Sequence, residues 1–543
     1  MKIFKLCHNH IRNHIAALAI YIVLTIAIAA IGIFSPYIIG SFLDNLIEGA
    51  DLSVIIYFCI IFGGLSVLGI LSNYITTMLF VKMQTKMAYD LNMETIKHVQ
   101  HLSLSHTNNQ NNAYLSQRIT NDSATLTEYC ITILQGIMTN TAMFIVPFFL
   151  LLRMNLLIAV LLICFLFAYV ISYFAFRKPL YDVRLAFTEA QSKFFSRLYE
   201  QLKYIKQIKL NSIQPEMGKR ADEGFESYRN STIRNQRVNY FYTGMDGFVS
   251  TIAQIVLFVV GGIQVLRGNF TIGMFTIFTS YFNMMLGSSR YFFGLGANYQ
   301  NALVSYNRIT EFLTRVPETC GAKSINDIDK IQMEGVHFSY DIDSNEKVLS
   351  NLYAKFEKGT IYAISGANGT GKSTLINLIM GMYVDEFEGF IKYDGVDIRQ
   401  INMTNARKFL FGYAEQEPAL FNESIGYNLT YGNSLTTCEG KMLNLIKTLG
   451  MEDFMSKHTL DYMINEGNNN TSGGEKQKIS ILKVLLKDPS VIILDEPTSA
   501  LDMASKSALK AYLDEIKKEK IIIVITHDND FINNTNDVVI NIK

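Results

Sequence analysis

The first 300 residues contain six long apolar runs that lack Asp, Glu, Lys and Arg altogether. Each run is long enough to cross about 30 Å of hydrocarbon as an α-helix that rises about 1.5 Å per residue. One such run could be a buried helix of a soluble protein, but six predict a membrane domain with six transmembrane helices. The runs are Ile15–Leu43, Val54–Val81, Ile131–Leu152, Met154–Phe176, Phe248–Leu266 and Phe270–Ser289.

The rest of the chain has shorter apolar runs between charged stretches, a pattern typical of an α/β domain. A polar stretch with Pro317 and Gly321 lies between the two parts and marks the expected boundary. We therefore expect a transmembrane domain over residues 1–315, a linker over 316–327 and an α/β domain over 328–543.

The connections between the apolar runs differ sharply in charge, although the whole chain has a formal net charge of zero. Thirteen Lys or Arg lie between Arg177 and Tyr242, whereas the first, third and fifth connections hold only Arg153 and Arg267. The positive-inside rule therefore places both termini in the cytoplasm. A cleaved signal peptide is the alternative for the first run, but this run is about twice the usual length of such an apolar core.

A phosphate-binding loop, the P-loop, follows the strand-like run Ile361–Ile364 and precedes a helix-like run. Its sequence Gly-Ala-Asn-Gly-Thr-Gly-Lys-Ser fits the pattern G-x-x-x-x-G-K-[ST] in the strand–loop–helix context that the motif requires. Backbone N–H groups of such a loop wrap the phosphates, the lysine contacts the β and γ phosphates, and the serine hydroxyl binds Mg²⁺. The expected nucleotide-binding residues are Gly366, Asn368, Gly369, Gly371, Lys372, Ser373 and Thr374.

A second apolar strand ends in two carboxylates about 120 residues after the P-loop. The run Val491–Leu494 indicates a buried parallel strand, and Asp495 and Glu496 follow it directly. In a P-loop ATPase, this arrangement makes Asp495 a support for Mg²⁺ and Glu496 the group that polarises the attacking water. Taken alone, Glu496 could be a solvated strand end.

Over essentially its whole length, the chain resembles ATP-binding cassette transporters of the exporter type. The segment Thr471–Glu475 resembles the family's LSGGQ signature, with Thr471 for the usual Leu and Glu475 for Gln. The resemblance implies that Ser472, Gly473 and Gly474 close over the γ-phosphate held by the P-loop of a second subunit. A small hydroxyl and two glycines suit this contact, because backbone must approach a polyanion at a helix start.

Further residues match family motifs one at a time, and the resemblance implies their roles. Gln416 matches the Q-loop glutamine, which contacts Mg²⁺ or the attacking water, and Asp502 ends a segment that resembles the D-loop. Tyr340 matches the aromatic residue that stacks on adenine, although a strand aromatic in the core is the alternative. His527 matches the switch histidine on the γ-phosphate, although a lone histidine is usually structural. The pair Glu466 and Gly467 resembles the cross-subunit loop of exporters.

The resemblance also concerns the two long cytoplasmic connections. It implies that membrane helices extend far into the cytoplasm and turn at short coupling helices that rest on the ATPase domains. We expect these coupling helices near Thr107–Ala113 and Asn211–Glu216.

These features predict a half-transporter in the cytoplasmic membrane, with a six-helix membrane domain and a C-terminal P-loop ATPase domain. Glu496, His527 and Ser472 are all present, so we expect a homodimer with two active sites, although a heterodimer stays open. Expected cofactors are ATP and Mg²⁺. Expected partners are the second subunit, membrane lipid and the exported substrate, with no nucleic acid.

The substrate is expected to be amphipathic or hydrophobic, because no apolar run carries an ionisable residue. The first span begins near residue 15, which leaves no room for an N-terminal peptidase domain. The first choice is therefore a separately matured peptide of the antimicrobial or signalling type, and the second is a lipid or drug. Two other classes stay open: an ATP-gated channel or membrane regulator, and a membrane-anchored ATPase that acts on proteins.

Overall fold

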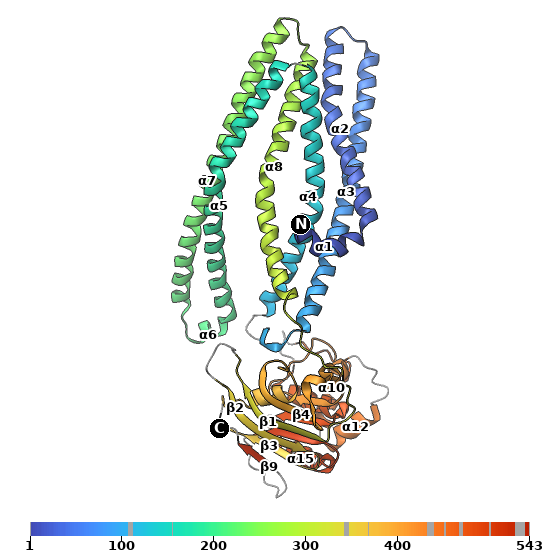
Figure 1. Ribbon diagram of the computed structural model, residues 1–543, viewed down its shortest axis with the longest axis vertical. Helices are drawn as coiled ribbons and strands as arrows, with labels where there is room; N and C mark the ends of the chain where they lie inside the picture. Colours follow the sequence, from blue (N-terminus) through green and yellow to red (C-terminus); the bar gives the residue numbers. More distant parts are fainter. Residues whose placement is uncertain are drawn as a thin grey trace. The chain divides into compact units, whose positions relative to one another are not determined.

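The computed structural model describes residues 2–106, 112–154, 156–340, 347–367, 369–431, 439–449, 452–465, 471–498, 501–526 and 538–541. The chain divides into two compact units (Figure 1). The first unit comprises Met1–Ile96 and Ala113–Leu313. The second comprises Lys97–Asn112 and Thr314–Lys543.

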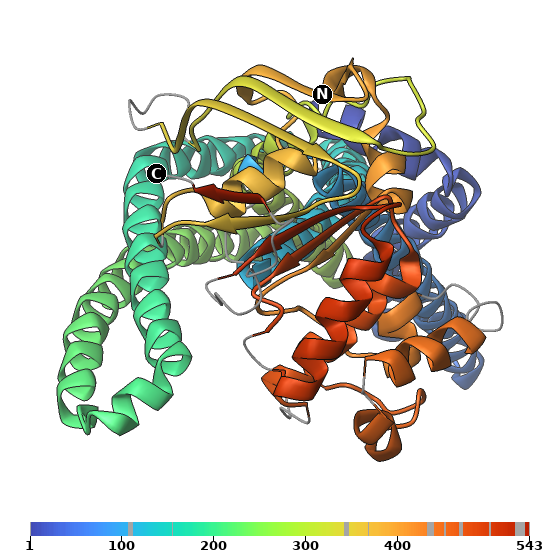
Figure 2. The ribbon, with the colours of Figure 1, turned by 90° about the horizontal axis from the view of Figure 1, so that it is seen from below.

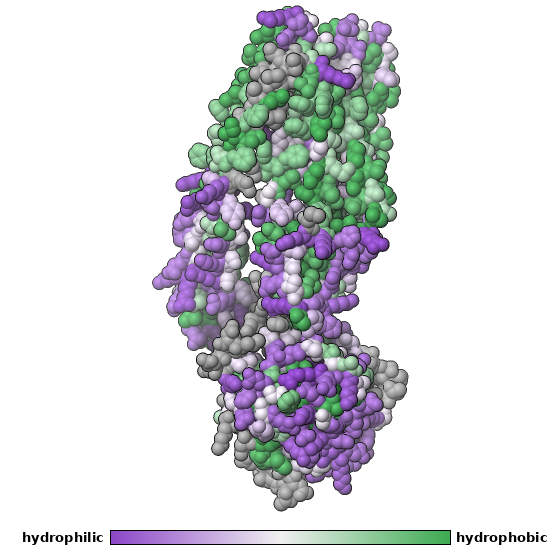
Figure 3. Space-filling view, in the orientation of Figure 1, coloured by the Kyte–Doolittle hydropathy of each residue, from purple (hydrophilic) through white to green (hydrophobic). Residues whose placement is uncertain are grey.

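The first unit is built from long helices that run alongside one another (Figure 1). Their exposed apolar side chains cover much of its upper part, and the lower parts of α5 and α7 are hydrophilic (Figure 3). The helices are α1 (Lys2–Arg12), α2 (Ile15–Ile47), α3 (Leu52–Gln100), α4 (Asn112–Met154), α5 (Leu156–Lys203), α6 (Ile205–Leu210), α7 (Gln214–Leu266) and α8 (Ile272–Leu313).

Four helices are long and apolar enough to cross a membrane among the described residues, namely α2, α3, Ile119–Met154 of α4, and α7. The predicted fourth and sixth crossings lie on α5 and α8. Many side chains of the α5 segment are outside the described residues. The α8 segment is less apolar, and its large side chains Phe278, Tyr281 and Phe282 are buried in a cluster within the unit. A helix that faces protein needs less apolar surface than one that faces lipid.

Close packing joins α2 to α8. A Cβ atom on Gly40 would lie 2.7 Å from the carbonyl oxygen of Gly273, so only glycine allows this approach. One helical turn later, the Asp44 carboxylate accepts hydrogen bonds from the Thr271 hydroxyl, at 2.6 Å, and from the Gly273 N–H, at 2.7 Å. Asp44 thereby satisfies donors at the start of α8.

The second long connection is helical, because α5 and α7 continue as a packed pair beyond the apolar runs. Phe194 of α5 stacks on Tyr228 of α7 with ring centroids 5.4 Å apart. The prediction of a short helix at Asn211–Glu216 is wrong: the short helix is α6, which ends at Leu210. Pro215 fits the first turn of a helix, so it begins α7.

The first connection carries a short 3₁₀ helix, η1 (Leu104–His106), and most of the predicted coupling helix at Thr107–Ala113 lies outside the described residues. Within the second unit, Leu104 packs against the apolar core. The hydroxyl groups of Ser103 and Ser105 both donate to the Glu386 carboxylate, the latter at 2.8 Å. The connection is therefore built into the second unit.

The second unit contains two sheets. A four-stranded antiparallel sheet has the order β2-β1-β4-β5, and a five-stranded parallel sheet has the order β6-β7-β8-β3-β9. The strands are β1 (Lys330–Phe338), β2 (Leu349–Glu357), β3 (Ile361–Ser365), β4 (Phe387–Tyr393), β5 (Val396–Asp397), β6 (Phe411–Ala414), β7 (Val491–Asp495), β8 (Ile521–Ile525) and β9 (Val538–Asn541).

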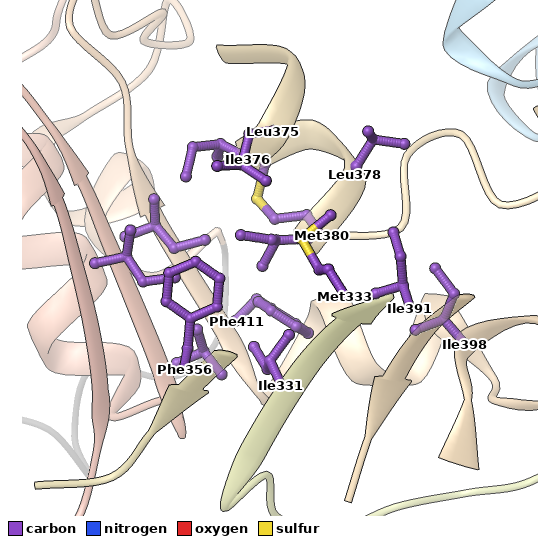
Figure 4. Packing of buried hydrophobic residues seen from close by; sticks show 14 of the residues in the cluster. Ile331, Met333, Phe356, Leu375, Ile376, Leu378, Met380, Ile391, Ile398 and Phe411 are labelled. Carbon is purple, nitrogen blue, oxygen red and sulfur yellow. The ribbon is translucent and has the colours of Figure 1, made fainter. Parts of the chain in front are cut away.

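Helices pack on the parallel sheet and form two apolar cores. The first core joins the two sheets around α9 (Lys372–Ile379). There Leu375 and Ile376 belong to the same apolar cluster as Ile331 and Phe356 (Figure 4). The second core lies under the orange and red helices on the other face of the parallel sheet (Figure 2). The remaining elements are η2 (Ile398–Gln400), α10 (Met403–Phe409), α11 (Ile425–Thr430), α12 (Glu439–Thr448), α13 (Glu452–Lys457), α14 (Gly473–Lys487) and α15 (Met503–Ile516).

Strands β3, β7 and β8 are apolar on both faces because both cores cover them. Parallel strands place their carboxyl ends along one edge, and ligands of open α/β sheets bind at that edge. The P-loop follows β3 and Asp495 ends β7, so both segments leave the sheet there.

Candidate functional site

The P-loop connects β3 to α9 through left-handed backbone. Gly369 and Gly371 have φ angles of +85° and +92°, which glycine adopts without strain. Gly371 also precedes the first residue of α9, and a Cβ atom there would lie 3.0 Å from the Leu349 side chain. The pattern of glycines therefore encodes the loop conformation locally.

Lys372 folds back on its own loop. Its Nζ atom donates to the carbonyl oxygens of Gly366, at 2.6 Å, and Ala367, at 3.0 Å. A phosphate oxygen would compete with these carbonyls for the ammonium group. Ser373 is exposed beside it, whereas Thr374 is buried.

Tyr340 lies next to the start of α9. Its hydroxyl hydrogen-bonds the Thr374 hydroxyl at 2.8 Å, and its ring packs edge-on against Phe338 and Tyr383. The residue is nevertheless 49% exposed. Its geometry thus combines a core contact with accessible ring surface, as a stacking residue requires.

Asp495 ends β7 in a half-buried position and accepts a hydrogen bond from the Tyr413 hydroxyl at 3.3 Å. Partial burial raises the pKa of Asp495 above its ordinary value, and the neighbouring Glu496 charge raises it further, against the opposing effect of the Tyr413 hydrogen bond. A half-buried carboxylate in this environment favours a nearby cation.

Glu496 is held in left-handed backbone, with a φ angle of +45°, by hydrogen bonds at three points. Its N–H donates to the Ile525 carbonyl at 2.8 Å, and its carbonyl accepts from Gln477 Nε2 at 2.7 Å. Its carboxylate accepts from Gln416 Nε2, also at 2.7 Å. This conformation is uncommon for a residue other than glycine, and such residues cluster at functional sites.

The residues predicted to bind Mg²⁺ offer suitable donors. The Ser373 hydroxyl, the Asp495 carboxylate and the Gln416 amide supply oxygen atoms, which Mg²⁺ prefers. Among the described residues, no group of three His, Cys, Asp or Glu side chains could hold a metal ion. A Mg²⁺ ion here would therefore depend on nucleotide phosphate oxygens for the rest of its ligands.

The signature segment forms the start of α14. Ser472 is the N-cap residue, and its hydroxyl accepts a hydrogen bond from the Glu475 N–H at 3.3 Å. Glu475 reaches back and accepts from the Ser472 N–H at 2.7 Å, which completes a capping box. Thr471, which directly precedes the N-cap residue, is buried.

Asp502 is the N-cap residue of α15. Its carboxylate accepts hydrogen bonds from the Ser505 N–H, at 2.8 Å, and the Ser505 hydroxyl, at 3.1 Å, and these bonds lower the pKa of Asp502. Lys478 of α14 lies 3.8 Å from the same carboxylate. Asp502 thus links the starts of α14 and α15, and its nucleotide-binding role stays a prediction.

The structure brings only some of the predicted residues together. Gln416, Asp495 and Glu496 meet at the ends of β6 and β7, and Tyr340 contacts the P-loop helix. The signature lies at the start of another helix, α14. Asn368, Glu466, Gly467 and His527 lie outside the described residues.

Three contacting residues were not predicted from the sequence: Tyr413, Gln477 and His458. Gln477 carried a usable signal, since it is a polar residue among buried positions of α14 and must find a partner there. Tyr413 and His458 gave no such signal, because their partners lie 82 and 17 residues away in sequence.

Comparison with known proteins identifies the family. Residues 18–289 match the family model for the ABC transporter transmembrane region, and residues 349–499 match the family model for the ABC transporter. The chain therefore belongs to the ATP-binding cassette transporters.

Two relatives match different shares of the chain. It is 34% identical over 304 residues to ABC transporter B family member 1 of Dictyostelium discoideum, a match that covers 55% of this chain and 33% of that one. It is 26% identical over 464 residues to the putative multidrug export ATP-binding/permease protein YgaD of Bacillus subtilis. This match covers 84% of this chain and 79% of that one. The chain thus spans about a third of the Dictyostelium relative and most of the bacterial one.

A solved structure has the same fold as this chain, although the two sequences have low identity. A bacterial Atm1-family ABC exporter with ATP bound aligns with a TM-score of 0.83 and 19% identity, over 98% of this chain and 94% of that one. The chain has the exporter fold, a helical transmembrane domain followed by a nucleotide-binding domain.

Proposed function

We propose that this chain is one half of an ATP-driven exporter that moves an amphipathic or hydrophobic compound across the cytoplasmic membrane. Two copies form the transporter, with both termini in the cytoplasm. The observation that carries the proposal is the placement of Glu496, which directly follows Asp495 at the sheet edge from which the P-loop also leaves.

In this mechanism, Lys372 leaves the carbonyls of Gly366 and Ala367 and binds the β and γ phosphates of ATP. Tyr340 stacks on adenine. Ser373, Asp495 and Gln416 would hold Mg²⁺, which would offset phosphate charge. Glu496, whose backbone is left-handed, accepts a proton from the attacking water.

The second subunit completes each site. Ser472, Gly473 and Gly474 stand at the start of the 15-residue helix α14, whose first N–H groups lack intrahelical partners. Such a helix start binds an anion well. We infer that it meets the γ-phosphate on the opposite subunit, so that two ATP molecules close the dimer and hydrolysis reopens it. In the same mechanism, His527 binds the γ-phosphate.

The first candidate substrate is a peptide of the antimicrobial or signalling type. The second is a drug-like compound or lipid, and the bacterial relative's designation as a putative multidrug exporter favours a drug. Both candidates agree with apolar membrane helices that lack ionisable residues in their spans.

The test is transport by the full chain in sealed lipid vesicles with the ATPase domains outside. Wild-type protein should accumulate a labelled amphipathic peptide or dye against its gradient when ATP and Mg²⁺ are added. Glu496→Gln is the matched control and should fail. Equilibration without uphill accumulation would instead support an ATP-gated channel, and the preferred label would distinguish peptide from drug and lipid.

A further inference from the structure

The signature of this chain contains an acid where the ATP site should hold a polyanion. Glu475 Oε2 lies 3.0 Å from the Ser472 hydroxyl oxygen, the group expected to face the γ-phosphate. A carboxylate in this position repels phosphate, and it also occupies the same helix start that favours anions. A working signature therefore needs something that holds this carboxylate in place.

The structure supplies a partner for the acid from a different segment. His458 follows α13, and its Nε2 atom lies 3.3 Å from Glu475 Oε1. The Glu475 carboxylate thus contacts Ser472 through one oxygen and His458 through the other. The side chains of His458 and Glu475 are only 14% and 27% exposed, so water screens their interaction weakly.

His458 is itself held in place by packing. Its ring contacts the Tyr462 ring, with centroids 4.5 Å apart. Burial raises the pKa of Glu475, but the Ser472 hydrogen bonds and the His458 contact outweigh it and leave this pKa below its ordinary value. Glu475 therefore stays ionised, with the His458 ring beside it.

We propose that His458 is a positioning residue of the signature motif: it holds the Glu475 carboxylate in the capping box, turned toward its own ring, when the signature meets the partner's ATP. This inference rests on the proposed two-subunit site. Gly473 and Gly474 are then left to present their N–H groups to the γ-phosphate while Glu475 stays turned toward His458.

Two substitutions at His458 separate this role from simple packing. His458→Phe keeps an aromatic ring against Tyr462 and removes the nitrogen that contacts Glu475. His458→Gln keeps an N–H donor for the carboxylate. Each is combined with Glu475→Gln, which removes the carboxylate that His458 is proposed to hold.

The readout is ATP hydrolysis by the full chain in lipid, with the KM for ATP and kcat measured separately. His458→Phe should raise KM about tenfold, because it removes a hydrogen bond to a charged group, while kcat changes little. His458→Gln should restore most of the affinity. When Glu475→Gln is already present, adding His458→Phe should not change the KM for ATP further.

Equal KM changes in both backgrounds, or none in either, would overturn the inference and leave the proposed function intact. A wild-type chain that hydrolyses no ATP would overturn the proposed function together with the inference. Melting temperatures measured on each variant show whether a loss of folding accounts for a change in KM.

Discussion

Gln416 Nε2 donates to Glu496 Oε2 at 2.7 Å, so the Q-loop glutamine and the proposed catalytic base contact each other directly. The same Glu496 receives a hydrogen bond on its backbone carbonyl from Gln477 of the signature helix. Glu496 is therefore hydrogen-bonded to two motifs. The Q-loop is expected to sense Mg²⁺ and the membrane domain, and the signature helix is expected to contact the partner's ATP.

Replacing the proposed base tests its role first. Glu496→Gln keeps the size of the side chain and removes its ability to take a proton, so turnover should fall by roughly 10²- to 10⁴-fold. ATP binding should persist and hold the dimer closed. ATPase rates and cross-linking in ATP measure the two effects, and near-normal turnover would refute the assignment of Glu496.

Removing the P-loop ammonium should act on binding. Lys372→Ala deletes the charge expected to meet the β and γ phosphates, so ATP affinity should drop by about tenfold or more. A binding titration measures it directly. Unchanged affinity would mean that Lys372 remains on the Gly366 and Ala367 carbonyls when nucleotide binds.

Gln477 should affect hydrolysis without affecting binding. Gln477→Met keeps a similar length but loses the donor to the Glu496 carbonyl, which leaves left-handed backbone less well held. We expect kcat to fall about tenfold. The lost hydrogen bond contributes on the order of 1 kcal/mol, and a misoriented Glu496 carboxylate should lower the rate further. ATP affinity serves as the internal control, and a fall in affinity with unchanged kcat would contradict this role.

A large residue in the signature should block closure. Ser472→Arg places a bulky side chain where the γ-phosphate must meet the start of α14, so ATP-driven closure and turnover should be lost while each P-loop still binds ATP. Glu475→Gln should be milder, because removal of an acid near a polyanion eases closure. Normal hydrolysis by Ser472→Arg would contradict the signature assignment.

Local patterns explain why much of the nucleotide site was predictable. The glycines at 369 and 371 encode positive φ angles within the loop itself, and Asp495 follows a strand that is apolar on both faces. The partners of Gln477 and His458 depend instead on how distant segments pack. The place of Gln477 among buried positions of α14 indicates that it needs a partner, but not which one. The second short helix lies earlier in the chain than predicted, because Pro215 is compatible both with a helix start and with a break between helices, and here it begins α7.

The most direct test of the two-subunit site uses mixed dimers. Subunits with Ser472→Arg and with Glu496→Gln are co-expressed with different tags, and the heterodimers are purified in lipid. If each site combines one subunit's P-loop and Glu496 with the other's signature, this pair contains one intact site and should regain up to about half of wild-type ATPase activity, one site of two. The matched control places both substitutions on one subunit beside a wild-type subunit, which leaves no intact site and should stay inactive. Activity in the control and none in the mixed pair would contradict the account, because each site would then lie within a single subunit.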